Sequence, residues 1–390
     1  MAIVNYKKFP FIGQDFIDWR TWPFHWELKD WTDNDYWYCE IFSGESLDKF
    51  PLHIIIEPET LEKIKTDERT FLYINNSHEA FHRIVPWVYK SVVNRLGIPA
   101  EKIYVMTESA DLHTVVQQYA DEYKVKPFRV EWVMVFQANV KDSTVQRPVQ
   151  GDVPLPSKLP STLHDKSYPK RFLNFNRRWR LHRPTLVAML IANDLVDYGH
   201  VSLGVDDGDG SWHKVYGWIE YKFKDDPEVS ELLRANKKKI ITHPPMYLDT
   251  TDLTVNQAHI SSKTNYLYED SLVSVVSETN FFKEFERGRF LSEKTWKPIA
   301  LRHPFIMVTV PKTLELLQEM GYKTFSPWID ESYDQEDDDV KRMKLIVKAI
   351  ERISKMSDEE VKDFIMNVRP IVDHNRKLFA ETTTFIRRTL

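Results

Sequence analysis

Two short segments combine acidic, basic and amide side chains in a pattern that suits phosphate and sugar binding. The first runs from Ser277 through Glu278 to Asn280, and the second contains Ser292-Glu293-Lys294. Ser292 can cap a helix beginning at Glu293, so Lys294 and the unpaired N–H groups of that helix could neutralise phosphate while the carboxylate accepts ribose hydroxyls. A simple capping motif would have the same sequence. We expect this segment to bind a charged ligand.

Another basic group follows a different apolar run. Arg177 and Arg178 come directly after Phe172 to Phe175. Guanidinium groups at the carboxyl end of a strand can grip a diphosphate through paired hydrogen bonds. The alternative is a solvated helix start with surface arginines. Because the Glu278 segment follows its own apolar run, Ser271 to Val276, we expect both groups at one edge of the same sheet.

A third polar segment is Asn75 to Glu79, which follows the apolar run Phe71 to Ile74. His78 or Glu79 could act there as a general base towards an acceptor. A helix cap with a glutamate in the first turn explains the same residues without any function.

Several common chemistries lack their motifs. The sequence has no Gly-x-Gly-x-x-Gly, no Gly-x-x-x-x-Gly-Lys-Ser/Thr and no Gly-x-Ser-x-Gly segment, which argues against nicotinamide, P-loop and α/β-hydrolase chemistry. The Asp-rich stretch 206–210 does not fit the calcium-loop pattern, because Trp212 occupies the sixth position, where the pattern requires glycine. With one cysteine and dispersed histidines, we expect no metal site and no cofactor.

The bulk composition is that of an ordinary water-soluble protein. The chain has 390 residues, which is long enough for two domains, and 42% of them are hydrophobic. Its net charge of −5 shows that the chain as a whole is not strongly basic. Cys39 has no partner for an internal disulfide, no apolar run reaches the ~18 residues of a membrane span, and the start shows no signal-peptide pattern. We expect a cytoplasmic protein without membrane contact, in the host cytoplasm if the protein is viral.

The elements that must position these residues alternate between strand and helix. The first series has predicted strands at 53–56, 71–74, 102–107 and 128–136 and helices near 79–95 and 109–123. The second has strands at 172–175, 200–203, 272–276 and 305–310 and helices near 180–194, 293–302 and 312–320, with a poorly periodic middle. Helical periodicity then covers 340–356, 358–368 and 372–387. This alternation is typical of parallel α/β sheets.

Prolines and polar residues without hydrophobic period separate the two series. We therefore predict two α/β domains in tandem, at 1–145 and 170–365, joined by a linker at 146–169 and followed by a C-terminal helix at 366–390.

With these residues in view, the chain resembles a known group of enzymes. Glu278-Thr279-Asn280 with the Phe290 to Lys294 segment resembles the donor region of fucosyltransferase-like glycosyltransferases of the GT-B fold. The segments at 174–178, 292–300 and 75–79 resemble viral glycosyltransferases that modify hydroxymethylated bases in DNA. The similarity covers roughly 170–330 and is thin elsewhere.

The resemblance implies a fold, a reaction and roles. The fold is α/β with two Rossmann-like domains facing a cleft, an N-terminal acceptor domain at 1–145 and a C-terminal nucleotide-sugar domain at 170–365. C-terminal helices would cross back, so that the helix at 366–390 packs on the first domain. Glu293 would hold the donor ribose, Lys294 the phosphates, and Arg177 or Arg178 the diphosphate, with Glu278 and Asn280 also in the donor region. The donor would be a nucleotide-diphosphate sugar, for example a UDP-sugar carrying glucose or arabinose, transferred without metal and with inversion.

The same resemblance favours 5-hydroxymethylcytosine in double-stranded phage DNA as the acceptor. A base flipped out of the duplex could be held by the Trp-rich N-terminus with Lys124, Lys126 and Arg129. A glycan acceptor is the competing enzyme hypothesis. A non-catalytic nucleotide or nucleic-acid binding module of the same fold is the alternative from another class.

Overall fold

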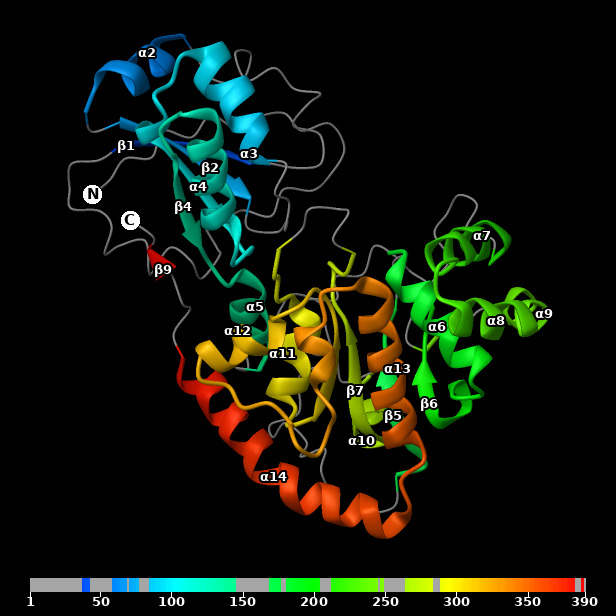
Figure 1. Cartoon of the computed structure of the whole chain (residues 1–390). Helices are drawn as coiled ribbons and strands as arrows, with labels where there is room; N and C mark the ends of the chain where they lie inside the picture. The colour runs from blue at the N-terminus through cyan, green and yellow to red at the C-terminus, as the bar shows by residue number, and fades with distance from the viewer. Residues whose placement is uncertain are drawn as a thin grey trace. The chain divides into compact units, whose positions relative to one another are not determined.

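The computed structural model describes residues 37–42, 58–68, 70–76, 84–144, 168–176, 180–203, 212–244, 246–248, 264–282, 288–382 and 387–388. By its contacts the chain divides into two units, drawn in Figure 1. Unit 1 comprises Met1–Ala138, Glu286–Phe290 and Thr383–Leu390, and unit 2 comprises Asn139–Phe285 and Leu291–Thr382. None of the described helices is long and apolar enough to cross a membrane.

The sheet of unit 1 keeps its strands in the order of the chain. The parallel strands are β1 (Trp37–Phe42), β2 (Thr70–Asn76), β3 (Ile103–Thr107) and β4 (Arg129–Trp132), and the short β9 (Arg387–Arg388) pairs antiparallel with β4. Successive crossovers therefore all step in one direction. Since such crossovers are right-handed, the connecting helices fall on one face of the sheet.

The helical segments of unit 1 are α2 (Pro58–Thr66), α3 (Ile84–Trp87) continuing as the π-helical η5 (Val88–Asn94), η6 (Ala100–Lys102), α4 (Leu112–Tyr123) and the start of α5 (Val135–Thr144). Alternate strand residues such as Leu72, Ile74 and Val105 pack against them in one core. Gly97 follows the helical segment formed by α3 and η5 and ends it with φ of +70°, a conformation that suits glycine. The opposite side of the strands presents Phe71 and Tyr104, which touch edge to face.

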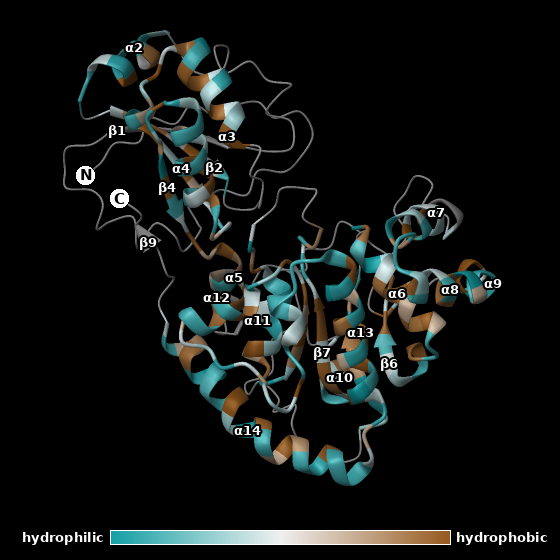
Figure 2. Cartoon of the chain, in the orientation of Figure 1, coloured by the Kyte–Doolittle hydropathy of each residue, from teal (hydrophilic) through white to brown (hydrophobic). Residues whose placement is uncertain are grey.

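The sheet of unit 2 has a different order, β6-β5-β7-β8, and all its described strands are parallel. The strands are β5 (Lys170–Asn174), β6 (Gly199–Val201), β7 (Ser271–Ser277) and β8 (Phe305–Val308). Every residue of β7 is buried, and Figure 2 shows this strand as hydrophobic, as expected for a central strand covered on both faces.

Helices of unit 2 cover both faces of this sheet. They are α6 (His182–Ala192), α7 (Trp212–Lys222), α8 (Pro227–Ala235), α9 (Lys237–Ile241), α10 (Asn265–Glu269), α11 (Glu293–Ala300), α12 (Thr313–Glu319), α13 (Asp339–Ser354) and α14 (Asp358–Glu381), with short 3₁₀ turns η7 (Val196–Tyr198) and η9 (Ser332–Gln335). The crossovers through α6 and α11 step in opposite directions from the centre, which places these two helices on opposite faces.

The predicted fold class, α/β with two Rossmann-like domains, is confirmed by the two sheets, whose strands are parallel except for the short β9. The predicted strand at 128–136 is too long, because β4 ends at Trp132 and α5 begins at Val135. The backbone N–H of Phe136 donates to the buried Glu108 carboxylate at 2.7 Å, which fixes the first turn of α5. An apolar run of this kind does not distinguish strand from buried helix.

The helices predicted at 358–368 and 372–387 are one helix, α14, with Pro370 inside it. Proline removes one backbone hydrogen bond, but the apolar side of α14, including Phe364, Val368 and Phe379, is buried and outweighs that loss. Figure 2 shows the alternation of hydrophobic and hydrophilic residues along α14. The poorly periodic middle contains α7 to α10.

The residues that return to unit 1 at the C-terminus are Thr383–Leu390, whereas α14 groups with unit 2 through Thr382. The predicted helix at 366–390 therefore differs from the structure, which ends the helix at Glu381. The predicted strand at 53–56 and nearly all of the predicted linker lie outside the described residues.

Candidate functional site: the strand reversal in unit 2

The strand order of unit 2 reverses between β5 and β7, since the chain continues from β5 to β6 on one side and from β7 to β8 on the other. At such a reversal the loops leaving the two strands diverge, and ligands of open α/β sheets bind beside them at the carboxyl ends. The predicted segments after Asn174 and after Ser277 both leave the sheet at this point. The reversal is therefore the candidate site.

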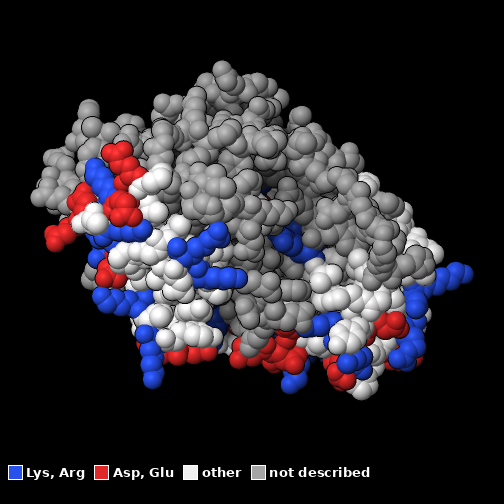
Figure 3. All heavy atoms as spheres, turned by 90° about the horizontal axis from the view of Figure 1, so that it is seen from above, with Lys and Arg blue, Asp and Glu red and all other residues white. Residues whose placement is uncertain are grey.

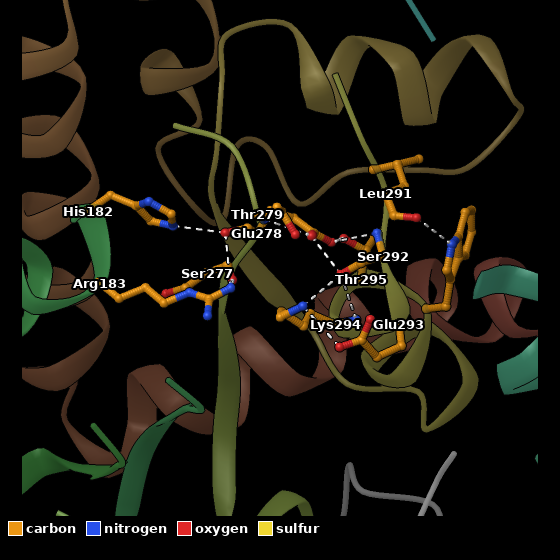
Figure 4. A network of polar contacts seen from close by, with 11 residues as sticks. His182, Arg183, Ser277, Glu278, Thr279, Leu291, Ser292, Glu293, Lys294 and Thr295 are labelled. Atoms are coloured by element: carbon orange, nitrogen blue, oxygen red, sulfur yellow. Dashed lines mark hydrogen bonds and ion pairs between the residues drawn. The ribbon is translucent and has the colours of Figure 1, made fainter. Parts of the chain in front are cut away.

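Glu278 is the centre of this site. Its buried carboxylate accepts hydrogen bonds from the backbone N–H of Thr279 (3.2 Å) and Ser292 (2.9 Å) and from the hydroxyls of Ser292 (2.7 Å) and Thr295 (2.6 Å). The close-up in Figure 4 shows these groups meeting. A carboxylate at a helix start is favoured by the helix dipole. Glu278 thus fastens the first turn of α11 to the end of β7, and its geometry is that of a positioning group.

Glu293 and Lys294 stand on the helix start that Glu278 holds. Ser292 is the N-cap, and its hydroxyl oxygen accepts from the Lys294 backbone N–H at 3.3 Å. The Lys294 ammonium donates to Glu293 Oε1 at 2.9 Å and to Ser292 Oγ at 3.1 Å. The side chains of Glu293 and Lys294 remain 15% and 27% exposed, so a ligand can reach the pair.

The electrostatics of α11 favour an ionised Glu293. Burial alone raises the pKa of this carboxyl, but the positive charges of Lys294 and Lys297 and the hydrogen bond from Lys294 bring its pKa below 4.5. Glu293 is therefore a carboxylate at neutral pH, able to accept hydrogen bonds from a diol.

The first turn of α6 approaches the same loop from β5. His182 Nε2 donates to the backbone oxygen of Glu278 at 2.8 Å, and the Arg183 guanidinium donates to the backbone oxygens of Ser277 and Glu278 at 3.2 and 3.4 Å. Burial, together with the charges of Arg183, Arg180 and Lys294, keeps the pKa of His182 well below 6.5. A neutral imidazole and a buried cation thus hold the end of β7.

Amide side chains connect β5 with β7 beneath these loops. Asn174 Nδ2 donates to the backbone oxygen of Val275 at 2.7 Å and to Ser277 Oγ at 3.1 Å, and it is itself contacted by Asn176 Nδ2. The backbone N–H of Asn176 donates to Ser202 Oγ at 3.1 Å. The two strand ends at the reversal are therefore cross-linked by hydrogen bonds.

Phe281 gives the loop after β7 its support. Its ring stacks on His182, with ring centres 5.6 Å apart, and the guanidinium carbon of Arg342 lies 4.4 Å from its centre. Arg342 is buried and donates to the backbone oxygens of Phe281 (2.7 Å) and Thr309 (3.1 Å) and to Asp339 (2.6 Å). Residues that follow β7 and β8 are thus fixed to α13.

The predicted site residues are distributed unevenly. Glu278, Asn280, Glu293 and Lys294 lie together at the reversal, where Asn280 is buried. Arg177, Arg178, His78 and Glu79 lie outside the described residues, and their roles stay predictions. In the sequence, Arg177 and Arg178 lie between β5 and α6.

Sequence reasoning did not single out His182 and Arg183 as individual site residues. Both belong to the basic stretch that begins at Lys170, but only the fold shows that they bond the backbone of the opposite loop. Among the described residues, no cluster of His, Cys, Asp or Glu could hold a metal ion.

No known protein family matches this sequence, and no curated protein matches it either. A search of solved structures finds trehalose-6-phosphate synthase, OtsA, at 12% sequence identity and a TM-score of 0.35, over 84% of this chain and 75% of that chain. A similarity of that size does not define a family or an activity for this chain.

Proposed function

We propose that the chain is a GT-B glycosyltransferase that binds a nucleotide-diphosphate sugar at the β5/β7 reversal of unit 2. The observation that carries this proposal is the pair Glu293 and Lys294, partly exposed at the start of α11 and held there by the buried Glu278. A carboxylate suits the ribose diol, and an ammonium beside a helix N-terminus suits the diphosphate.

In the proposed reaction the acceptor hydroxyl oxygen forms a bond to the anomeric carbon while the bond from that carbon to the diphosphate oxygen breaks. Lys294, the first N–H groups of α11 and the predicted Arg177 or Arg178 would stabilise the departing negative charge, as electrostatic catalysis requires. The acceptor proton would pass to His78 or Glu79. A single displacement of this kind inverts the configuration at the anomeric carbon.

The favoured acceptor is 5-hydroxymethylcytosine in DNA, on the resemblance of residues 174–178, 292–300 and 75–79 to viral DNA glycosyltransferases. A glycan acceptor is the second candidate, and the net charge of −5 favours it. On the face drawn in Figure 3, described Lys and Arg side chains lie beside Asp and Glu at both sides, and others lie apart from acidic residues near the middle. A protein that binds DNA through its phosphates usually shows a basic face.

The deciding experiment incubates the purified protein with a panel of nucleotide sugars and either hydroxymethylated DNA, unmodified DNA or oligosaccharides. Mass spectrometry of the nucleosides and glycans identifies the product, and parallel reactions with EDTA test the proposed independence from metal. We expect a glycosylated nucleoside with one UDP-sugar. Transfer to an oligosaccharide with untouched DNA would replace the favoured acceptor.

A non-catalytic binding module makes a different prediction for the same panel. It would bind a nucleotide sugar, as measured by titration calorimetry, yet neither transfer nor hydrolyse it. If the protein binds none of the nucleotide sugars, both the glycosyltransferase hypothesis and the binding-module hypothesis are contradicted.

A further inference from the structure

A buried amide follows β5 at the candidate site of unit 2. Asn176 lies two residues beyond the end of β5, and its side chain is fully buried. Its backbone N–H donates to the hydroxyl oxygen of Ser202, the residue after β6, at 3.1 Å. The preceding residue, Phe175, packs its ring towards Tyr268 of α10, with ring centres 5.9 Å apart. Contacts within unit 2 therefore fix the chain at Asn176.

The hydrogen bonds of Asn174 determine which way the Asn176 amide is turned. Asn174 Nδ2 donates to the backbone oxygen of Val275 at 2.7 Å and to Ser277 Oγ at 3.1 Å. Asn174 Oδ1 is then the atom that meets Asn176, and it accepts from Asn176 Nδ2. Turning the Asn176 amide by half a rotation would bring two oxygens together. The amide oxygen of Asn176 therefore points away from Asn174.

Within the described part of unit 2, this oxygen of Asn176 has no hydrogen-bond partner. A buried amide oxygen without a hydrogen bond is unfavourable, and native structures rarely leave one unexplained. Asn265 Oδ1 is a second oxygen of this kind, but it lies at the start of α10, which precedes β7, and so at the amino edge of the sheet. Of the two, Asn176 lies at the carboxyl edge, where the strand order reverses and ligands of open sheets bind.

The amide and the charged pair of α11 belong to different sides of β7. Glu293 and Lys294 are on the crossover from β7 to β8, whereas Asn176 follows β5, the neighbour of β7 on the other side. A neutral amide oxygen accepts O–H and N–H groups and does not attract phosphate. It suits the uncharged parts of a nucleotide sugar, which are the N–H of the base and the hydroxyls of the sugars.

We propose that Asn176 Oδ1 accepts a hydrogen bond from an uncharged O–H or N–H group of the bound nucleotide sugar and so helps to select that ligand. The inference rests on the proposed function for its ligand. Because Asn176 is fully buried, the ligand must displace neighbouring side chains to reach this oxygen. A ligand that lacks the matching donor leaves the oxygen unpaired, and the site discriminates against it for that reason.

The test uses the full-length protein and titration calorimetry with UDP and UDP-glucose. Asn176→Ala removes the amide, and Asn176→Ser, which keeps a polar group beside Asn174, carries the same measurements if the alanine variant folds poorly. Asn265→Ala is the matched control, because it removes the same group, also with an unpartnered oxygen, from the other edge of the described sheet. We expect Asn176→Ala to weaken UDP-glucose binding about tenfold and Asn265→Ala to stay within about twofold of the wild type.

Ligand analogues separate direct contact from a structural effect and locate the donor group. UDP methylated on the base nitrogen lacks the N–H, and deoxy analogues of UDP-glucose each lack one hydroxyl. One analogue should bind the wild type about tenfold more weakly than its parent ligand, yet bind Asn176→Ala as tightly as the parent does, because the acceptor is already gone. A loss that UDP shares places the donor group on the nucleotide, and a loss confined to UDP-glucose places it on the transferred sugar.

The proposal is overturned if Asn176→Ala binds UDP-glucose like the wild type, if Asn265→Ala weakens binding equally, or if every analogue loses the same affinity in the variant as in the wild type. In each of these cases the wild type still binds UDP-glucose, so the proposed function stands without this contact. If the wild type binds neither UDP nor UDP-glucose, the proposed donor and the contact with Asn176 are both contradicted.

Discussion

The two sheets differ in one respect that matters for function: the sheet of unit 2 reverses its strand order and the described sheet of unit 1 does not. In unit 1 the parallel strands follow in chain order, and their helices build one core on one face. In unit 2 the reversal separates the loops after β5 and β7, and polar side chains fill the space between them.

The comparison indicates that position in the topology, and not the charge of a segment, distinguishes the candidate site. Unit 1 also carries basic residues, such as Lys126 and Arg129, but Lys126 forms an exposed ion pair and Arg129 lies over the Tyr104 ring. The partly exposed Glu293 and Lys294 of unit 2 instead share a helix start at the reversal.

The largest effect is expected from breaking the connection between the strand end and α11. Glu278→Ala leaves the N–H and hydroxyl groups of Ser292 and the hydroxyl of Thr295 without their acceptor, which should lower the free energy of unfolding of unit 2 by about 4 kcal/mol. Urea unfolding measures this change in the free energy of unfolding. The control is Glu319→Ala, an exposed position on α12 where we expect a change below about 0.5 kcal/mol. Equal effects would show that Glu278 has no special role.

Acid should destabilise unit 2 through its buried histidines. Burial lowers the pKa of His303 from 6.5 to about 4. Between these two pH values the histidine is protonated in the unfolded chain and neutral in the folded protein. This contribution to stability is complete above about pH 6.5 and is lost as the pH falls towards about 4, by roughly 3 kcal/mol in total.

His303→Asn should flatten that part of the profile, measured by urea unfolding across the same pH range. The difference between variant and wild type isolates the histidine, because the raised pKa values of Glu331 and Asp334 act in the opposite direction in both proteins. The exposed His113 of unit 1 provides the control variant His113→Asn, with which the profile of His303→Asn is compared. An unaltered slope for His303→Asn would contradict the assignment.

Removal of either partly exposed charge at the start of α11 should weaken ligand binding more than it lowers the stability of the fold. Glu293→Ala and Lys294→Ala should each weaken nucleotide-sugar binding roughly 100-fold, the size of two to three kcal/mol of charge-assisted hydrogen bonding. Their unfolding midpoints should stay near that of the wild type. Lys126→Ala in unit 1 provides the comparison, and equal affinity for Lys126→Ala and Lys294→Ala would end the distinction between the units.

The smallest effect on stability is expected from glycine-to-alanine substitutions that alter only a backbone conformation. Gly97→Ala in unit 1 places a side chain at φ of +70°, with only Lys65 Cε near the new Cβ at 3.8 Å, and should cost about 1 kcal/mol. Gly321→Ala in unit 2, at φ of +89° and 3.4 Å from Leu378, should cost at least as much. Unfolding curves test both, and neither variant should change donor affinity.

The strongly periodic elements of the fold were predictable from sequence. β3, β5, β7 and α11 begin and end within one or two residues of their predicted limits, because buried apolar runs between capping residues define them. The strand β1 was not predicted, since its Trp-rich surroundings show no clear period. The helix α8 was missed although Asp226 caps it and Pro227 opens it, a start signal that the sequence does contain.

For the site, four of the predicted residues, Glu278, Asn280, Glu293 and Lys294, lie at or beside the end of β7 and the start of α11, but their individual contacts were not predicted. Glu278 was expected among the donor-binding residues, yet its carboxylate is engaged by Ser292 and Thr295, partners that only the fold brings into contact. The interactions of His182 and Arg183 are with backbone oxygens of a distant segment, and such contacts leave no trace in residue spacing.

The Glu278 carboxylate also constrains how the sequence can diverge. Its oxygens accept from the hydroxyls of Ser292, fourteen positions later, and Thr295, seventeen positions later, so an apolar residue in place of Glu278 would leave both buried hydroxyls without this acceptor. Such residues should change together or not at all. The trio is therefore a search pattern for distant relatives, more selective than overall identity.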